Sequence, residues 1–523
     1  MTSDPLTAVA GRAPDRPAVV DDRRGLGGDL RVLDFAALDA LTNRIANGLD
    51  ALGVEPGSHV AWCGQNSLEL IAMLHACRKA GVVSVPLNYR LADEELAYVL
   101  ADCDAVAAVV DAAVAGRIAA ASHGAPRLRH LAVFGGEPPA AGSTTRAAIG
   151  TFADLLAGDE PPDPARRQGP TTSMIYTSGT TGRPKGALKP AGDPAQLDAF
   201  LDLVHYDDGG VFITTGPLYH SGPNAFAGRA QGRGMTVVTQ YRFDPLDWLR
   251  LVEEWGVTAT FSAPTPVRRI CALDDDAFAA HDVSSMRSMV ANAAPWPQAL
   301  KEAYLARFPA DSLREVYGAT ELGIITLLDA GDQLTKPASC GKVLPLVELE
   351  LRTDDGGVVD EPFEPGEIWV RASSVLAGYH NAPDKFAEEH DPDGWHTVGD
   401  IAYRDDEDYL YVCDRRKDVI ISGGVNIYPA EIEAVLERHP DVFEATVFGI
   451  PSDEWGEAVH AVVEARRGDL DAAEVIAFAR THLTGYKVPR SVDFVTELPR
   501  TGSGKVLKRQ LRAPYWEGTG RLV

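Results

Sequence analysis

The sequence has few cysteines, and none of them stands in a metal-binding spacing. Only six of the 523 residues are cysteine, and no two of them form a Cys-x-x-Cys pair. A zinc site built on such pairs and a disulfide framework are therefore both disfavoured, and scattered thiols are typical of a reducing compartment. We expect a cytoplasmic protein.

Cations are also scarce, with 49 Lys and Arg against 75 Asp and Glu, and the net charge is −26. Such a surface argues against broad binding to nucleic acid or to anionic membranes, although a few placed cations can still hold a nucleotide. The most apolar long stretch, 105–122, contains Asp111 and Arg117. The first twenty residues lack the basic start and apolar core of a signal peptide. We therefore expect no stable membrane anchor.

The chain is too long for one ordinary hydrophobic core, so two or more domains are expected. Helical spacing over 35–52 and 67–80 alternates with strand-like runs at 59–63, 81–86, 105–111 and 131–134. This alternation predicts an α/β fold with βαβ units and parallel sheets. The sequence pattern changes near residue 410, after which a charged stretch begins at Asp414. We predict a large N-terminal domain over 1–413 and a small α+β domain over 414–523, with a hinge between them.

The sharpest local signal is a loop rich in glycine and hydroxyl groups that follows a strand-like run, Met174-Ile175-Tyr176. Glycines let the backbone wrap a polyanion, hydroxyls donate to phosphate oxygens, and a lysine neutralises charge. A flexible linker is the alternative, but linkers rarely combine an apolar lead-in with a Pro-Lys-Gly exit. A Walker A loop is excluded, because that pattern places the lysine directly after a glycine. The sequence therefore predicts a phosphate-binding loop at Thr177-Ser178-Gly179-Thr180-Thr181-Gly182-Arg183-Pro184-Lys185-Gly186.

The loop resembles the signature loop of the adenylate-forming superfamily, which contains acyl-CoA synthetases, luciferases and the adenylation domains of peptide synthetases. Four further motifs resemble that family in the same order, so the resemblance covers the chain from about residue 30 to residue 512. They are Tyr317-Gly318-Ala319-Thr320-Glu321, then Val398-Gly399-Asp400, then 414–418 with the glycine-rich 422–433, and finally Pro499-Arg500-Thr501-Gly502-Ser503-Gly504-Lys505.

The resemblance implies attack of a carboxylate on the α-phosphorus of ATP, with pyrophosphate leaving. Both reactants are anions, so cations and a metal are needed to bring them together. The loop from Thr177 to Lys185 would hold the β- and γ-phosphates, Thr320 the α-phosphate, and Glu321 a Mg²⁺ ion that takes its other ligands from phosphate and water. Lys505 would stand between the α-phosphate and the carboxylate.

The resemblance also implies a nucleoside site. Tyr317 would pack on adenine beside Gly318, and Asp400 would accept from the ribose hydroxyls, with Arg415 nearby. The family's adenine-lining stretch resembles G-G-A-x-P, and here it reads Ala291-Asn292-Ala293-Ala294-Pro295. Asn292 replaces a glycine, and asparagine tolerates an unusual backbone angle. We expect Asn292, Ala293 and Ala294 to line adenine.

In this family the C-terminal domain rotates for a second step, in which coenzyme A takes the acyl group. Lys417 is the expected hinge. Gly423 and Gly424 would then leave a slot for the pantetheine arm, although an ordinary tight turn explains the same pair.

The segment from Gly216 to Asn224 resembles the family's acid pocket, with His220 as its aromatic gate. It carries no aspartate to pair with an ammonium group, so amino acids are disfavoured and a fatty, aromatic or polycyclic acid is expected. An acyl carrier protein acting in trans is an alternative acceptor, and no fused carrier domain is expected after Lys505. A luciferase-like oxygenase has no specific support. The intact motifs argue against a non-catalytic nucleotide-binding protein. Related enzymes are commonly dimers, so a homodimer stays open.

Overall fold

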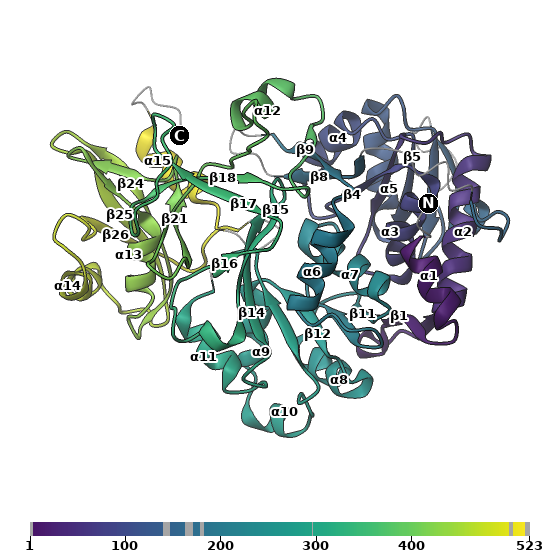
Figure 1. The fold of residues 1–523 in the computed structure, drawn as a ribbon, viewed down its shortest axis with the longest axis horizontal. Coiled ribbons are helices and arrows are strands. Elements are labelled where there is room, and N and C mark those ends of the chain that lie inside the picture. Colours follow the sequence, from purple (N-terminus) through teal and green to yellow (C-terminus); the bar gives the residue numbers. More distant parts are fainter. Residues whose placement is uncertain are drawn as a thin grey trace. The chain divides into compact units, whose positions relative to one another are not determined.

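The computed structural model describes residues 4–139, 147–162, 171–177, 183–294, 296–500 and 506–517. The chain forms two compact units (Figure 1). Unit 1 comprises 1–337, 344–347 and 371–396, and unit 2 comprises 338–343, 348–370 and 397–523. The predicted domain boundary at Asp414 lies inside unit 2 and stays a prediction.

One sheet of unit 1 carries the predicted phosphate loop. Strands β3 to β6 and strand β8 join in parallel pairs, as the alternating pattern predicts, whereas β9 is antiparallel to β8. The order is β19 (Gly378–Tyr379), β9 (Lys185–Pro190), β8 (Thr171–Thr177), β4 (Val83–Leu87), β3 (His59–Cys63), β5 (Ala107–Asp111), β6 (His130–Phe134) and β7 (Ala148–Thr151).

A second sheet of unit 1 carries the Tyr-Gly-Ala-Thr-Glu motif at the end of a parallel series that closes with an antiparallel hairpin. Its order is β15 (Gly323–Leu328), β14 (Leu313–Ala319), β13 (Ser288–Ala291), β12 (Ala259–Ser262), β10 (Val211–Thr214), β11 (Thr236–Gln240), β1 (Pro17–Asp22) and β2 (Leu30–Asp34). The α/β prediction for this part of the chain is confirmed.

Two helices of unit 1, α2 and α3, begin and end within one residue of the ranges predicted from helical spacing, 35–52 and 67–80. Ser67 accepts from the backbone N–H of Leu70 and caps α3, which ends at the left-handed Gly81. In Figure 1, α3 and α5 lie beside β4 and β5. The helices are α1 (Pro5–Arg12), α2 (Phe35–Ala51), α3 (Leu68–Ala80), α4 (Asp93–Asp102), α5 (Ala112–Ala121), α6 (Pro194–Leu203), α7 (Ser221–Arg233), α8 (Pro245–Trp255), α9 (Pro264–Cys271), α10 (Asp275–Ala279), α11 (Gln298–Leu305) and α12 (Pro383–Glu389).

Unit 2 contains two sheets and its own apolar core around Ile420, Ile432 and Val463. The first sheet is β17 (Glu348–Arg352), β18 (Gly366–Arg371), β20 (Asp400–Arg404) and β21 (Leu410–Arg415). The second is β23 (Val425–Ile427), β22 (Ile420–Ser422), β25 (Gly456–Ala465) and β24 (Val442–Ser452), with β26 (Ser491–Val495) beside β25. Its helices are α13 (Pro429–Leu436), α14 (Ala472–His482) and α15 (Lys508–Trp516).

The structure bears on two expectations from the composition, the absence of a disulfide framework and the absence of a membrane anchor. None of the six cysteines, all of which lie in the described part of the chain, forms a disulfide. Among the described helices, none is long and apolar enough to cross a membrane.

Candidate active site

The predicted phosphate loop joins the ends of two antiparallel strands. Strand β8 ends at Thr177, β9 begins at Lys185, and these two residues are paired across the ladder. The intervening Ser178, Gly179, Thr180, Thr181 and Gly182 lie outside the described residues, so their contacts with phosphate stay predictions.

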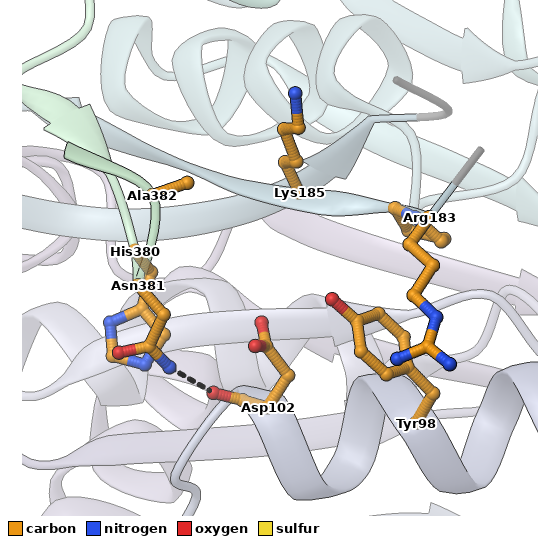
Figure 2. A pocket seen from close by; sticks show the side chains of 8 residues that line it. Tyr98, Asp102, Arg183, Lys185, His380, Asn381 and Ala382 are labelled. Atoms are coloured by element: carbon orange, nitrogen blue, oxygen red, sulfur yellow. Dashed lines mark hydrogen bonds between the residues drawn. The ribbon is translucent and has the colours of Figure 1, made fainter. Parts of the chain in front are cut away.

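The exit of the loop borders a cavity of about 260 Å³. The Arg183 guanidinium lies 5.0 Å from the centre of the Tyr98 ring, which holds it by a cation–π contact. Asn381 donates to the Asp102 carbonyl at 3.2 Å. In Figure 2 the Lys185 side chain extends to the other side of β9 from Tyr98 and Asp102. The side chains of Arg183 and Lys185 therefore point in different directions. Arg183 contacts the Tyr98 ring at one side of the cavity.

The turn over 320–322, between β14 and β15, is held by a hydrogen bond to each of its backbone carbonyls. The Lys189 ammonium donates to the first at 2.7 Å, and the backbone N–H of Leu376 donates to the second at 2.7 Å. The Ser374 hydroxyl donates to the third at 2.8 Å. Because the carbonyls are fixed, the side chains of Thr320 and Glu321 start from a preorganised backbone.

Glycine at position 318 is required by the close approach of the two strands that flank this turn. A Cβ there would lie 2.1 Å from the carbonyl oxygen of Gly323. The ladder between β14 and β15 shifts register between Tyr317 and Gly318. The glycine of the Tyr-Gly-Ala-Thr-Glu motif therefore has a packing reason that is independent of any nucleotide.

Lys189 is a site residue that the sequence analysis missed. Its Nζ donates to the carbonyls of Thr320 and Ser374, at 2.7 and 2.8 Å. Burial lowers the pKa of this amine to about 8, while Glu321 opposes the shift and Arg229 adds to it. The available signal was a charged residue inside the otherwise apolar run Gly186–Pro190. Strand β9 therefore links the phosphate loop, at Lys185, to the turn that carries Glu321.

The side chains of Thr320 and Glu321 have different surroundings. The Thr320 hydroxyl is hydrogen-bonded to the Ser221 hydroxyl at 2.9 Å. The half-buried Glu321 carboxylate makes no hydrogen bond or ion pair with another residue in the described part of the chain. A carboxylate with free oxygens is the donor that Mg²⁺ prefers, so this residue fits a metal ligand.

His220 lies directly beside this group, because it occupies the N-cap position of α7 and precedes Ser221. Its carbonyl accepts from the backbone N–H of Asn224 at 3.1 Å. Its ring centre is 4.3 Å from that of Tyr219. Unit 1 thus brings His220, Thr320 and Glu321 together.

The stretch expected to line adenine follows β13. Asn292 donates from Nδ2 to the Val316 carbonyl at 2.6 Å, next to Tyr317. The unusual backbone angle falls on Ala293, with φ of 75°, and not on Asn292. The expectation that Asn292, Ala293 and Ala294 line adenine stays a prediction. The Asn292 side chain links the end of β13 to β14. Ala293 adopts the left-handed backbone conformation, which is about 1–2 kcal/mol unfavourable for an alanine.

Unit 2 contains the remaining predicted residues. Asp400 begins β20 and stands opposite Arg415 in the ladder with β21, and their side chains form a 3.1 Å ion pair. Lys417 lies in the turn after β21, where the N–H of Asp418 donates to the Arg415 carbonyl at 2.8 Å. Lys505 is outside the described residues, so its role stays a prediction.

Gly423 and Gly424 form a two-residue turn between β22 and β23. Both have positive φ, 58° and 81°, which is the conformation of a tight hairpin. The tight turn that the sequence analysis named is therefore present. Whether the same turn also passes a pantetheine arm stays a prediction.

A partly buried acidic residue beside the predicted hinge was not among the predicted site residues. Asp414 accepts from the backbone N–H of Ala430 at 3.0 Å and so connects the end of β21 to the start of α13. Burial raises its pKa to about 6, with the Lys508 ammonium opposing that shift. Lys508 itself forms a 2.8 Å ion pair with Glu433.

Comparison with known proteins identifies the family of the chain. Residues 6–380 match the family described as AMP-binding enzyme, and residues 431–505 match its C-terminal domain. The chain belongs to the AMP-binding enzyme family. This confirms the resemblance to adenylate-forming enzymes.

Named members of the family are similar over nearly the whole chain. Feruloyl-CoA synthase from an Amycolatopsis species is 37% identical over 92% of this chain and 94% of its own length. Indoleacetate–CoA ligase from Aromatoleum aromaticum is 36% identical over 92% and 93%. The solved structure of ATP-bound MatB from Rhodopseudomonas palustris has a TM-score of 0.86 at 28% identity and covers 99% of each chain.

Proposed function

We propose that this chain is an ATP-dependent acyl-CoA ligase that activates a carboxylic acid as an acyl adenylate and then forms the coenzyme A thioester. The observation that carries the proposal is the fixed turn over 320–322. The Glu321 carboxylate on this turn makes no hydrogen bond or ion pair in the described chain, and β9 connects the turn to the phosphate loop. Membership of the AMP-binding enzyme family supports the same reading.

In the first step, an oxygen of the substrate carboxylate attacks the α-phosphorus of ATP. The bond from that phosphorus to the bridging oxygen breaks, and pyrophosphate leaves. Lys185 and the loop hydroxyls would bind the outer phosphates, and Thr320, oriented by Ser221, would donate to the α-phosphate. Lys505 would neutralise charge between the two anions.

Glu321 would hold Mg²⁺, which when bound screens the charge of the phosphates. Tyr317 and the stretch over 292–294 are proposed to face adenine, and Asp400, oriented by Arg415, to accept from the ribose. His220 is proposed to border the acid carboxylate.

In the second step, the thiolate of coenzyme A attacks the acyl carbon and AMP leaves. We assign the turn at Lys417 to the rotation that exchanges the two steps, and the Gly423–Gly424 turn to the passage of the pantetheine arm. The chain is proposed to act in the cytoplasm. The alternative is transfer to an acyl carrier protein in trans.

The test is a pyrophosphate-release assay over aryl, short-chain, long-chain and polycyclic acids, each with and without coenzyme A. Turnover that requires coenzyme A and yields a thioester is the expected result. Pyrophosphate release that stops after about one equivalent in both arms, with later transfer to an added carrier protein, would favour the alternative. Failure of every acid to release pyrophosphate would contradict adenylation itself.

A further inference from the structure

Helix α7 leads away from the candidate site with one half of its surface incompletely covered. Its buried side packs on β10, β11 and α3. The other side consists of residues that are all only partly buried. We name this side the open face of α7, formed by Ser221, Asn224, Ala225, Gly228, Arg229 and Gly232.

The open face begins beside Thr320 and borders unoccupied space farther along the helix, at Gly228. Ser221, in the first turn, is hydrogen-bonded to Thr320. Two turns later, a Cβ built on Gly228 would meet no heavy atom within 4 Å. The residues between them are small, so this face can line a channel that begins beside the acid carboxylate.

A cation that has no counter-ion among the described residues, Arg229, lies farther along this face. In the described chain, Arg229 makes no hydrogen bond and no ion pair, although it is partly buried. The charged and titratable groups that act on it are Lys189, which is also a cation, and Tyr206. A partly buried guanidinium has lost part of its hydration, so an anion from outside would stabilise Arg229.

A second unsatisfied donor stands near Arg229. Tyr206 is fully buried, and its hydroxyl has no hydrogen-bond partner among the described residues. Its ring contacts that of Phe226, one turn before Arg229 on α7, with 5.9 Å between ring centres. Of these two donors, the guanidinium is the one that a ligand from outside can reach, and a carboxylate is the anion whose two oxygens match its fork of N–H groups.

We propose that Arg229 binds a second carboxylate of the substrate, so that the preferred acid is a dicarboxylic acid. This inference rests on the proposed function. Eight residues of helix separate Arg229 from Ser221, about 12 Å along the axis. A long helical side chain leans toward the N-terminus of its helix, which shortens the distance by several Å. The two carboxylates should therefore be about 6–12 Å apart, as in octanedioate or 4-carboxycinnamate.

The test compares matched acids on the wild-type protein and two variants. The pairs are octanedioate with octanoate, decanedioate with decanoate, and 4-carboxycinnamate with cinnamate. The readout is kcat/KM for coenzyme A thioester formation. We expect the wild type to prefer the diacid by at least about tenfold in one pair, since a buried charge-assisted bidentate bond is strong. Arg229→Met should lower the ratio of diacid to monoacid by about tenfold or more, and Arg229→Lys should restore part of it.

Arg233→Met is the matched control. This arginine lies one turn later on the same helix, but its charge is already met by Asp198 and Asp202. Its removal should leave the diacid ratio unchanged.

The outcomes separate this inference from the proposed function. Thioester formation from monoacids with no diacid preference in any pair would overturn the role of Arg229 and leave the ligase intact. An equal loss for both members of each pair in Arg229→Met would assign the residue to the fold alone. No thioester and no pyrophosphate from any acid would overturn both proposals.

Discussion

At the scale of single residues, the Lys189 amine connects strand β9 to the turn that carries Thr320 and Glu321. Its pKa in the folded state is about 8, against an ordinary 10.5. Between these two values the unfolded chain binds a proton that the folded chain does not. Unfolding free energy therefore rises with pH across this window.

Lys189→Met should remove that rise. We expect the wild-type unfolding free energy to increase by about 2–3 kcal/mol relative to the variant between pH 8 and pH 10.5, since one pKa unit corresponds to about 1.4 kcal/mol. Urea titrations at intervals of half a pH unit give the difference. Parallel curves for the two proteins would show that the amine titrates at its ordinary pKa.

Glu321 binds the metal in the proposed mechanism. Because its carboxylate makes no hydrogen bond or ion pair in the described chain, substituting it breaks no such contact. Glu321→Gln keeps the shape and removes the charge. We expect the Mg²⁺ concentration for half-maximal pyrophosphate release to rise about tenfold or more, the scale of a lost metal contact. A Mg²⁺ titration that matches the wild type would count against this ligand.

At the scale of elements, alanine substitutions at the two glycines of the turn between β22 and β23 should destabilise the fold for different reasons. A Cβ at Gly424 meets nothing within 4 Å, whereas one at Gly423 lies 2.9 Å from Cε3 of Trp455. Gly424→Ala should therefore cost only backbone strain, about 1–2 kcal/mol of unfolding free energy, and Gly423→Ala should cost more. Urea unfolding of the two variants tests this order, and equal costs would contradict it.

The same pair bears on the passage of the pantetheine arm. If the turn borders that passage, Gly424→Ala should slow thioester formation from supplied acyl-AMP and spare the adenylation step. Single-turnover assays of each step measure the difference. If thioester formation from acyl-AMP stays at the wild-type rate, the turn is structural only.

At the scale of the whole molecule, two substitutions should separate the half-reactions. Lys505→Ala should abolish adenylation from acid and ATP, because its charge acts between two anions, and should largely spare thioester formation from acyl-AMP. Isolated assays of both steps measure this. Comparable losses in the two steps would remove Lys505 from the adenylation role.

Lys417→Pro should give the reverse pattern. Proline fixes φ and so prevents the backbone change that a hinge must absorb. We expect adenylation to persist while thioester formation falls by about tenfold or more, the range expected for a blocked conformational step. Wild-type thioester formation in this variant would exclude Lys417 as the hinge.

The amino-acid sequence by itself determined the α/β fold, the alternation of strands and helices, and the family. These depend on local patterns, such as the cap at Ser67 and the ordered motifs from Thr177 to Lys505, which are legible along the chain. The tertiary structure decided what no local pattern contains. Lys189 supports the Thr320 carbonyl, the positive φ falls on Ala293, and Arg229 has no counter-ion among the described residues, because each of these depends on residues distant in sequence. A charge can be read from the sequence, but whether an opposite charge lies within reach is fixed only when the chain folds.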